Sequence, residues 1–352
     1  MRAALFRGLP KGFKAGHGSL GPEQRLSVED VPRPVPGRGE VLVRTSACGV
    51  CATDLHYLHG IPTFQTPPVI LGHEISGVVE ELGPESVGVK VGDPVLIPAV
   101  VSCGHCPACQ VGRDNICERG TMFGNHRDGG FAEYVRAPAN YVVPVPSRIP
   151  LVDSSLVADA LSTPFHAVKN RGQVRAGETV AVFGCGGVGL NAVQSAVAFG
   201  AMVIAVDIDD RKLALAKRLG AAEVVNSSSG ETAKKIRGLT GGGVDAAFEV
   251  VGRPDVLQTA FDSVRTGGRL VTVGYSEQEW PLKVSRVMFR EISVLGSLGC
   301  RSAEYPVILR LVEQGRLQLA PLISSKLRLD QVNEALENLE KGTVLGRQVV
   351  VF

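Results

Sequence analysis

Strand-like and helix-like segments alternate along the second half of the chain, beginning at Glu178. Apolar runs suited to strands occur at residues 179–183, 202–206, 246–249, 269–273 and 292–295. Stretches suited to helices lie between them, at residues 188–199, 210–219, 232–239 and 255–264. Because parallel strands need a crossover, usually a helix, this order predicts an α/β fold with a parallel sheet of about six strands.

A glycine-rich turn joins the first of these strands to the first helix. Its residues are Gly184, Cys185, Gly186, Gly187, Val188 and Gly189. Such a turn lets a pyrophosphate approach backbone N–H groups at a helix N-terminus. Asp207 ends the next strand, eighteen residues after Gly189, where a carboxylate accepts bonds from both ribose hydroxyls of an adenosine. The pattern predicts a dinucleotide site; the alternative is a turn that only packs the helix on the sheet.

Asp207 also bears on the choice between the two nicotinamide cofactors. Its negative charge would repel the 2′-phosphate of NADP, so we expect NAD to be preferred. Two basic residues, Arg211 and Lys212, follow closely and weaken this argument, because they would attract a phosphate. Lys212 is a further candidate for binding the cofactor.

The region from residue 1 to about 150 differs in texture from the second half of the chain. Short apolar runs at 41–43, 75–79 and 95–97 are separated by Gly and Pro, which predicts a mostly β region. A polar stretch at 10–21 looks like an excursion between the first two strands, and we assign it no function. The tail adds a predicted helix at 329–339 and a last strand at 347–351.

Four cysteines crowd one short segment of the β-rich region: Cys103, Cys106, Cys109 and Cys117. Thiolates at these spacings can converge on one tetrahedral Zn²⁺ ion. All four positions would then be filled by protein, so the site is expected to be structural. The alternative, a set of buried thiols that bind nothing, is disfavoured because half of the chain's eight cysteines lie here.

Charge and hydropathy narrow the class of protein. The 352 residues include 37 basic and 35 acidic side chains, a formal net charge of +2, which is no electrostatic footprint for nucleic acid or an anionic membrane. No segment has the apolar length of a signal peptide or a membrane span. We expect a cytoplasmic protein without nucleic-acid or membrane partners, and cysteines at metal spacings fit that reducing compartment.

A second group of candidate metal ligands lies upstream, in the motifs at 49–56 (GVCATDLH) and 72–74 (GHE). Cys51 and His73 supply one thiolate and one imidazole. With a third protein ligand they would leave one zinc position free for water or substrate, as in catalytic zinc sites. A solitary His is often only a satisfied polar residue, so this pattern gains its weight from the other motifs.

In this order, the motifs resemble those of the zinc-dependent medium-chain alcohol dehydrogenase family. The resemblance covers essentially the whole chain, including the segments at 248–252 and 346–350. It implies a Rossmann-type doubly wound parallel sheet inserted in a mostly β, GroES-like catalytic domain. The implied catalytic domain comprises residues 1–160 and 297–352 and carries the four-cysteine lobe, and the implied dinucleotide-binding domain comprises residues 161–296.

The resemblance assigns roles to residues of the upstream motifs. Cys51 and His73 resemble catalytic zinc ligands, and Asp54 resembles a carboxylate that orients the ligating imidazole. Thr53 resembles the hydroxyl that takes the proton from the substrate alcohol. His56 resembles the outer member of that proton relay; the alternative for it is an ordinary surface residue.

Three more residues take roles from the resemblance. Glu74 resembles a carboxylate that approaches the zinc during ligand exchange. Arg347 resembles a residue that contacts the cofactor pyrophosphate, with an ordinary strand-end charge as the alternative. Thr163 would lie near the nicotinamide ring.

The third catalytic ligand is where this chain departs from the best-known alcohol dehydrogenases of the family. Those enzymes have a Cys shortly before a Ser-Thr pair, and here Asp159 stands in that place before Ser162 and Thr163. Asp binds Zn²⁺ at a normal distance, so Asp159 is the expected ligand, with His166 and Asp153 as rivals. The change leaves the substrate open, because members with a carboxylate here are not restricted to simple alcohols.

The expected function is reversible hydride transfer between an alcohol and NAD, with two Zn²⁺ ions per chain, in a homodimer or homotetramer. Zn²⁺ lowers the pKa of a bound hydroxyl, and the cofactor takes the hydride. A dehydrogenase of polyols, or of hydroxylated cyclic or acyl-thioester substrates, is the close alternative. A zinc-free reductase gives no reason for the metal motifs, and a non-enzymatic zinc or NAD sensor gives none for Thr53 and His56.

Overall fold

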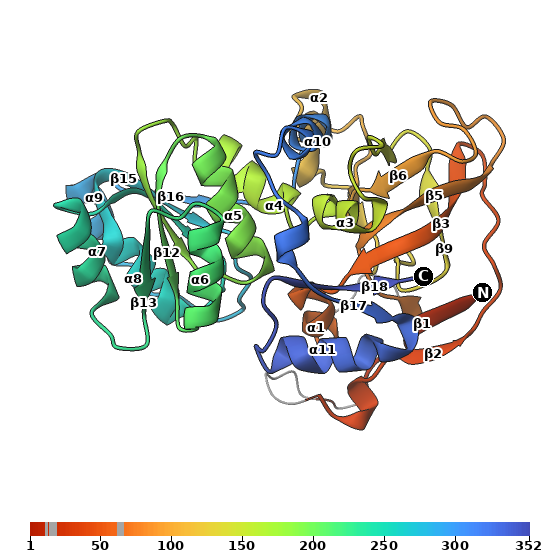
Figure 1. The fold of residues 1–352 in the computed structure, drawn as a ribbon, viewed down its shortest axis with the longest axis horizontal. Helices are drawn as coiled ribbons and strands as arrows, with labels where there is room; N and C mark the ends of the chain where they lie inside the picture. The colour runs from red at the N-terminus through yellow and green to blue at the C-terminus, as the bar shows by residue number, and fades with distance from the viewer. Residues whose placement is uncertain (11–12, 14–19, 62–66) are drawn as a thin grey trace. The chain divides into compact units, whose positions relative to one another are not determined.

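The computed structural model describes residues 1–10, 13, 20–61 and 67–352, and these form two compact units (Figure 1). Unit 1 consists of Met1–Ala160, Arg301–Gln314 and Leu319–Phe352; unit 2 consists of Leu161–Cys300 and Gly315–Gln318. Unit 2 is thus nearly continuous in sequence, whereas unit 1 draws on both ends of the chain. Most of the polar stretch at 10–21 lies outside the described residues.

Unit 2 is built on a six-stranded sheet with the order β13-β12-β11-β14-β15-β16, in which every neighbouring pair is parallel. Its strands are β11 (Thr179–Phe183), β12 (Met202–Asp207), β13 (Glu223–Asn226), β14 (Val244–Glu249), β15 (Val264–Thr272) and β16 (Ser293–Gly296). Its helices are α4 (Ser162–His166), α5 (Gly187–Ala198), α6 (Asp210–Arg218), α7 (Thr232–Thr240), α8 (Pro254–Ser263) and α9 (Val284–Arg290), with a π-helical turn η4 (Ala167–Arg171). The chain runs outward from β11 to β13 and restarts at β14, so the strand order reverses between β11 and β14.

The central strands of unit 2 are buried on both faces, which is why they read as continuous apolar runs. All four residues at 180–183 in β11 are buried. Phe183 shares a hydrophobic cluster with Ile236 of α7 and Phe261 of α8, which pack against the sheet. This packing fixes the carboxyl ends of the strands, where the glycine turn and Asp207 lie.

Unit 1 contains a seven-stranded, a three-stranded and a two-stranded sheet among its described residues. The large sheet has the order β10-β6-β5-β3-β18-β17, with β9 also paired to β3. Its strands are β3 (Glu40–Gly49), β5 (Glu74–Leu82), β6 (Pro94–Ile97), β9 (Tyr134–Pro138), β10 (Val143–Pro144), β17 (Ile323–Arg328) and β18 (Arg347–Val351). The small sheets are β1 (Arg2–Phe6), β2 (Ser27–Asp30) and β4 (Val69–Ile70), and β7 (Val100–Val101) with β8 (Thr121–Met122).

Short helices decorate the sheets of unit 1. The α-helices are α1 (Ala52–Leu58), α2 (Pro107–Gln110), α3 (Leu151–Ser154), α10 (Tyr305–Glu313) and α11 (Val332–Glu340). The 3₁₀ turns are η1 (Pro22–Gln24), η2 (Asp114–Ile116), η3 (Ser155–Ala158), η5 (Ser302–Glu304), η6 (Ala320–Leu322) and η7 (Leu329–Gln331). None of the helices in the described part of the chain combines the length and the hydropathy that a bilayer crossing requires.

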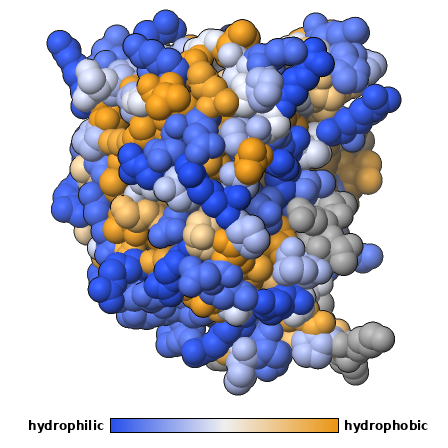
Figure 2. Space-filling view, turned by 90° about the vertical axis from the view of Figure 1, so that its right-hand side faces the viewer, coloured by the Kyte–Doolittle hydropathy of each residue, from blue (hydrophilic) through white to orange (hydrophobic). Residues whose placement is uncertain are grey.

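The last strand of the chain lies inside the large sheet, between β3 and β17. β18 pairs antiparallel with β3 and parallel with β17, and Figure 1 shows the blue C-terminal strand beside the orange β3. The face of the molecule seen in Figure 2 carries small groups of hydrophobic residues between hydrophilic ones. Scattered apolar side chains of this kind are usual on protein surfaces and mark no site.

The predicted parallel α/β sheet and the mostly β region are both present, so the fold class is confirmed. One strand of the parallel sheet was not predicted: β13 is a four-residue edge strand, exposed at Glu223, and its apolar pattern is weak. β17 of unit 1 was not predicted either. β15 begins at Val264, well before the predicted start at 269. Residues 265–267, near the start of this strand, are exposed and are polar or small. They therefore lack the apolar pattern on which the prediction relied.

Candidate metal centres and dinucleotide site

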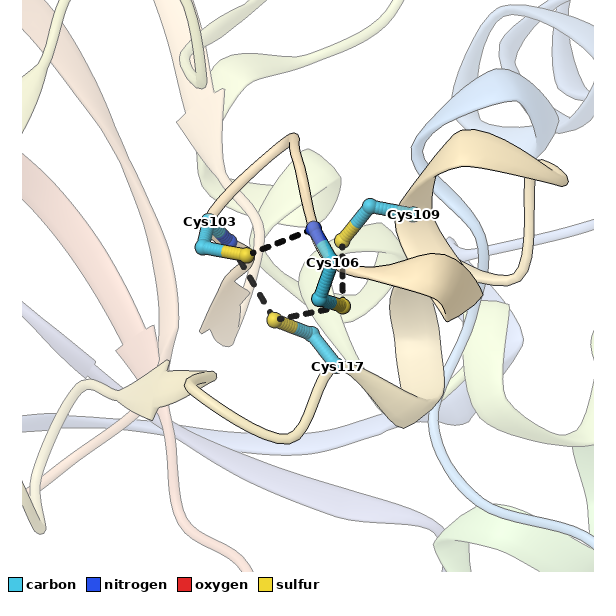
Figure 3. A group of neighbouring side chains, drawn as sticks. All are labelled: Cys103, Cys106, Cys109 and Cys117. Carbon is cyan, nitrogen blue, oxygen red and sulfur yellow. Dashed lines mark hydrogen bonds between the residues drawn. The ribbon is translucent and has the colours of Figure 1, made fainter.

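The four cysteines of the lobe converge between β7 and β8 of unit 1 (Figure 3). Their sulfurs all lie within 4.8 Å of one another. The Sγ of Cys106 is 3.5 Å from that of Cys109 and 3.8 Å from that of Cys117. Sulfurs bound at about 2.3 Å to one tetrahedral Zn²⁺ ion would be about 3.8 Å apart, whereas a disulfide bond measures about 2.0 Å. The cluster has the geometry of four ligands around one ion.

Backbone groups hold these sulfurs in place. The N–H of Cys106 donates to Cys103 Sγ at 3.3 Å, and the N–H of Cys103 donates to Cys117 Sγ at 3.2 Å. The N–H of Cys109 lowers the pKa of the Cys106 thiol to about 6, while burial raises the pKa of Cys117 to about 11. Four thiolates together need a cation to offset their charge, and Zn²⁺ fits this all-sulfur set.

A hydrogen-bonded contact attaches the lobe to a distant segment of unit 1. Asp114 in η2 accepts hydrogen bonds from the backbone N–H of Ser302, at 2.9 Å, and from the Ser302 hydroxyl, at 2.5 Å. Ser302 begins η5, which leads into α10. The lobe therefore secures the return of the chain into unit 1.

A second cluster of metal-binding side chains lies deeper in unit 1. Cys51, His73, Glu74 and Asp159 bring their ligand atoms within 4.8 Å of one another. Cys51 is the N-cap of α1, His73 and Glu74 stand where β5 begins, and Asp159 follows η3. The first three are buried, and the Asp159 side chain is 19% exposed. One sulfur, one nitrogen and carboxylate oxygens form a donor set that suits Zn²⁺.

His73 stands between two carboxylates. Its Nδ1 is 3.6 Å from Asp54 Oδ1, and its Nε2 is 3.6 Å from Asp159 Oδ2. The ring is fully buried, yet neither nitrogen makes a hydrogen bond with any residue the structure describes. Burial alone would lower the pKa of His73, but Asp159, Asp54 and Cys51 together raise it well above its ordinary value. The cluster therefore favours a positive charge at its centre, which fits a bound cation.

Asp54 links the two segments that carry Cys51 and His73. Its Oδ2 accepts a hydrogen bond from the Cys51 N–H at 3.0 Å, and its Oδ1 accepts one from the Gly72 N–H at 3.2 Å. Gly72 has a φ of 89°, and a Cβ atom there would lie 2.8 Å from Cys48 Sγ, so glycine is required next to the histidine. The expected partner of His73 thus also fixes the backbone on both sides of the cluster.

Glu74 forms an ion pair with Arg347, a residue that was expected at a different site. Arg347, expected at the cofactor pyrophosphate, is only 4% exposed; its NH2 lies 2.9 Å from Glu74 Oε1, and its NH1 donates to the Val50 carbonyl at 3.2 Å. Burial raises the pKa of Glu74 to about 7, although Arg347 opposes that rise. The alternative of an ordinary strand-end charge is wrong, because such a charge would face solvent; a contact with pyrophosphate stays a prediction.

Thr53 and His56 lie on α1, directly after Cys51. The Thr53 hydroxyl oxygen is 3.7 Å from Cys51 Sγ, so the hydroxyl borders the metal cluster. His56 follows three residues later, which puts the two side chains on one side of the helix. Both residues are half-buried.

The structure describes other contacts for the two rival third ligands. Asp153 belongs to α3 and forms an ion pair with Lys326 at 3.5 Å. His166 belongs to α4 in unit 2, and its Nδ1 lies 3.1 Å from Asn170 Nδ2. Among the described residues of unit 1, the ligand cluster includes Asp159 and not Asp153, so the geometry of this unit favours Asp159.

The glycine turn of unit 2 connects β11 to α5. Gly184 has a φ of 97°, and a Cβ atom there would lie 2.6 Å from Val251 Cγ2. A Cβ atom on Gly189 would lie 1.7 Å from the Gly184 carbonyl oxygen. The N-cap and the first two positions of α5 are Gly186, Gly187 and Val188. The first N–H groups of α5 have no carbonyl partner within the helix, which is the arrangement that binds a phosphate.

Asp207 ends β12 beside this turn. Its Oδ2 accepts a hydrogen bond from the Cys185 N–H at 2.6 Å, and its Oδ1 accepts one from the Asp209 N–H at 3.0 Å. Arg211 is bound to Asp209, with NH2 2.7 Å from Oδ2, and this contact lowers the pKa of Asp209 to about 2. The remaining candidates for cofactor binding are half-buried in α6 and α4, namely Lys212 and Thr163.

One functional element at this end of the sheet was not predictable from its residues alone. The turn at 250–253 follows β14 and reaches Gly184 through Val251. Glu249, at the end of β14, is fully buried and bonded to the turn. The 248–252 motif is visible in the sequence, but a Glu at the end of an apolar strand does not by itself indicate a buried carboxylate.

Two family models match the chain. A model described as alcohol dehydrogenase GroES-like domain matches residues 37–147, which include Cys51, His73 and the four-cysteine lobe. A model described as zinc-binding dehydrogenase matches residues 187–314, which begin at the glycine turn. The two models thus fall on the β-rich region and on the parallel sheet.

Whole-length relatives agree with these models. An alcohol dehydrogenase of Geobacillus stearothermophilus is 38% identical over 327 residues, which cover 92% of this chain and 96% of the relative. An acryloyl-coenzyme A reductase of Sulfurisphaera tokodaii is 30% identical over 333 residues, covering 94% of this chain and 97% of the relative. Among solved structures, an NAD-dependent alcohol dehydrogenase matches with a TM-score of 0.90 at 33% identity, covering 100% of both chains.

The parallel sheet with its glycine turn and the two metal clusters define an oxidoreductase that uses zinc and a nicotinamide cofactor. The family predicted from the motifs is confirmed: the chain belongs to the zinc-dependent medium-chain alcohol dehydrogenases. It is an enzyme of the alcohol dehydrogenase type, with a GroES-like and a Rossmann-type fold.

Proposed function

We propose that this enzyme oxidises an alcohol reversibly to an aldehyde or ketone with NAD⁺ as the hydride acceptor. The observation that carries the proposal is the buried cluster of Cys51, His73, Glu74 and Asp159, with the Thr53 hydroxyl beside it. When bound, Zn²⁺ polarises the substrate oxygen and lowers the pKa of its hydroxyl, and the nicotinamide ring takes the hydride. The chain's own residues hold these groups and move the proton.

Three side chains would hold the catalytic ion, namely Cys51, His73 and Asp159. Asp54 faces Nδ1 of His73, so that Nε2 is left for the ligand cluster, as ligating imidazoles usually require. Glu74 is a fourth donor within reach, and its ion pair with Arg347 keeps it in place. Three ligands with a fourth donor nearby support a zinc site that keeps one coordination position open and can exchange a ligand there.

The proton released from the substrate hydroxyl is proposed to pass to Thr53 and then towards His56. The position of the Thr53 hydroxyl at the cluster and the three-residue step along α1 support this order. Both groups are able to accept and donate a proton, which a relay requires.

NAD is proposed as the cofactor in preference to NADP. Asp207 stands at the carboxyl end of β12 with its carboxylate next to the glycine turn, where an adenosine ribose would lie. Arg211 is engaged by Asp209, which leaves it poorly placed to attract a 2′-phosphate. Both observations support selection against the extra phosphate.

A second Zn²⁺ ion per chain is proposed for the four-cysteine lobe. Sulfur spacings near those of a tetrahedral site support it. Its position would be closed to substrate, so the ion would stabilise the lobe and the Asp114–Ser302 contact rather than take part in the reaction.

A homodimer or homotetramer is the proposed assembly, in the cytoplasm. Exposed apolar side chains gather in and after α9 of unit 2, with Val284 79%, Met288 58% and Phe289 78% exposed. β16 is an edge strand of the sheet, and such edges are usually covered. The eight cysteines are free thiols, which fits a reducing compartment.

The close alternative is a dehydrogenase of a hydroxylated cyclic substrate, an acyl thioester or a polyol. The relative named as an acryloyl-coenzyme A reductase supports it. The family resemblance also places Ala99, which is small and buried here, where several family members carry an aromatic residue. The resemblance implies that this position borders the substrate, so a small side chain there would leave room.

The deciding experiment is a panel of primary, secondary, polyol, aromatic and thioester-linked alcohols with NAD⁺, followed by NADH absorbance. We expect zinc-dependent turnover of at least one simple alcohol. Turnover confined to thioester-linked compounds would favour the alternative. The absence of turnover in both directions with the fully zinc-loaded enzyme would contradict both.

A further inference from the structure

The point where the strand order of unit 2 reverses lies between β11 and β14. In open parallel sheets of this kind, ligands bind in the crevice outside the carboxyl ends of the two strands at the reversal. One wall of that crevice is the glycine turn after β11. The other is the turn at 250–253 after β14, which has no role in the mechanism above.

A buried carboxylate holds this second turn. Glu249, the last residue of β14, is 0% exposed, and its Oε1 accepts hydrogen bonds from the N–H groups of Val251, at 2.9 Å, and Gly252, at 2.8 Å. Its Oε2 has no hydrogen-bond partner among the residues that the structure describes. Burial raises the pKa of Glu249 above its ordinary value. A carboxylate in such a place is costly, and its two N–H donors offset part of that cost.

The turn that Glu249 holds has little freedom to move. Gly252 has a φ of 83°, and a Cβ atom there would lie 2.0 Å from the Tyr275 carbonyl oxygen. The N–H of Gly274 donates to the Glu249 carbonyl at 3.1 Å, which fastens the strand end to the next turn. The backbone is thus packed on one side and held by the carboxylate on the other.

The 250–253 turn also limits the space next to the glycine turn. The Val251 side chain is 44% exposed, and its Cγ2 would lie 2.6 Å from a Cβ atom on Gly184. The N–H of Val250 donates to the Phe183 carbonyl at 3.1 Å, directly before Gly184. A shift of the 250–253 turn would therefore change both walls of the crevice.

We propose that Glu249 is a positioning residue of the cofactor site, whose buried carboxylate holds the 250–253 turn as the wall opposite the glycine turn. The inference rests on the proposed function in one respect, because the ligand that reports on it is a nicotinamide dinucleotide. Glu249 itself need not touch the cofactor. Its effect passes through the backbone N–H groups of Val251 and Gly252.

Two variants grade the effect. Glu249→Ala leaves the N–H groups of Val251 and Gly252 without their acceptor, and that of Gly252 is buried, whereas Glu249→Gln keeps one oxygen acceptor without the charge. We expect the Kd for NADH, measured by fluorescence titration, to rise roughly tenfold in the first, which corresponds to about 1.4 kcal/mol, and less in the second. The KM for NAD⁺ should follow, while the KM for the alcohol, the zinc content and kcat at saturating NAD⁺ stay near wild type.

Glu178→Gln is the matched control. Glu178 is a partly buried carboxylate of the same unit, paired with Arg269 at 2.6 Å, but it precedes β11 and so lies at the opposite end of the sheet. We expect it to lower the thermal unfolding midpoint without changing the Kd for NADH. If the control variant weakens NADH binding as much as the Glu249 variants do, Glu249 is only a general stabiliser of the fold, and the inference is overturned.

The two ways to fail are distinguishable. Unchanged NADH affinity in folded Glu249→Gln and Glu249→Ala would overturn the inference and leave the proposed function intact. If Glu249→Ala does not fold, the Kd of Glu249→Gln decides alone. A wild-type enzyme that binds neither NADH nor NADPH would overturn the proposed function itself.

Discussion

The two metal clusters of unit 1 are built in opposite ways. The four-cysteine lobe takes every ligand from residues 103–117, and all four donors are sulfur. The cluster around His73 takes its donors from three segments, at residues 51, 73–74 and 159, and these donors differ in kind. Asp54 and Arg347 then hold members of that cluster from outside.

This difference in construction matches a difference in expected role: the four-cysteine cluster stabilises the fold, and the cluster around His73 takes part in the reaction. Four identical thiolate ligands from one segment fill every coordination position of a zinc ion, so no position remains for a substrate. Unequal ligands from distant segments depend on the surrounding fold for their positions, and one coordination position can be kept open. The second arrangement costs more buried polar groups, which is the usual situation at a site that must react.

Metal removal should separate the two clusters most sharply. An ion with an open position loses its ligands more readily than one enclosed by four thiolates, so mild chelation should strip the buried cluster first. We expect turnover to fall to background while one zinc per chain and the circular dichroism spectrum persist. Zinc content and activity are measured together along a chelator titration. A fully active enzyme with one zinc per chain would contradict the comparison.

Replacement of Asp159 should be the next largest effect. Even the outer partners of metal ligands cost about 10–100-fold when removed, so we expect Asp159→Ala to lose at least about 100-fold in kcat/KM and to lose catalytic zinc. Asp153→Ala is the control, because it removes a neighbouring buried carboxylate that pairs with Lys326 instead. Normal zinc content and turnover in Asp159→Ala would transfer the role of third ligand to His166 or Glu74.

Asp159→Cys sharpens the same test. A thiolate restores an anionic ligand, so zinc should be kept. The Zn–S distance of about 2.3 Å against about 2.0–2.2 Å for a carboxylate oxygen would move the ion and alter kcat. Loss of zinc in this variant would show that the site needs oxygen at this position.

Cys103→Ser should affect stability and spare the chemistry. With one ligand gone, the lobe loses its ion and the cross-link it provides, at a cost of roughly 2–5 kcal/mol, as for a native cross-link in a small domain. Thermal unfolding should begin at a lower temperature, while kcat per folded, zinc-loaded active site stays within about twofold, since surface-lobe changes act through stability. A fall in kcat at unchanged stability would erase the distinction between the clusters.

Asp207→Gly should leave both metal clusters untouched. We expect the preference for NAD⁺ over NADP⁺ in kcat/KM to fall about tenfold or more, because a hydrogen bond to a charged group contributes about 1.5–3 kcal/mol. Zinc content and thermal stability serve as controls. Equal use of both cofactors by the wild-type enzyme would refute the role of Asp207 and point to Arg211 or Lys212 as a phosphate partner.

Local patterns made much of the fold and site predictable. The cysteine spacings, the strand, turn and helix around Gly184, and the motif from Cys51 to His56 each carry their information within a few residues, and the structure brings these side chains together. The alternation of strands and helices sufficed for the parallel sheet because buried strands are uniformly apolar.

Partners far apart in the sequence were not predictable. The ion pair of Glu74 with Arg347 arises because β18 enters the sheet beside β3. Asp54 was expected to face His73, but its hydrogen bond to Gly72 depends on how α1 meets the start of β5. Glu249 gave no signal because burial of a carboxylate is decided by the neighbouring turns.

The position of β18 has a consequence for the order in which a newly made chain matures. Unit 2 is complete when residue 318 has been synthesised, whereas the large sheet of unit 1 still lacks β17 and β18 at that point. Domains generally fold as units during synthesis, so the later part of the polypeptide acquires its shape before the earlier part does. Arg347 reaches Glu74 only after β18 has been synthesised, so the ion pair at the cluster around His73 forms later than the fold of unit 2.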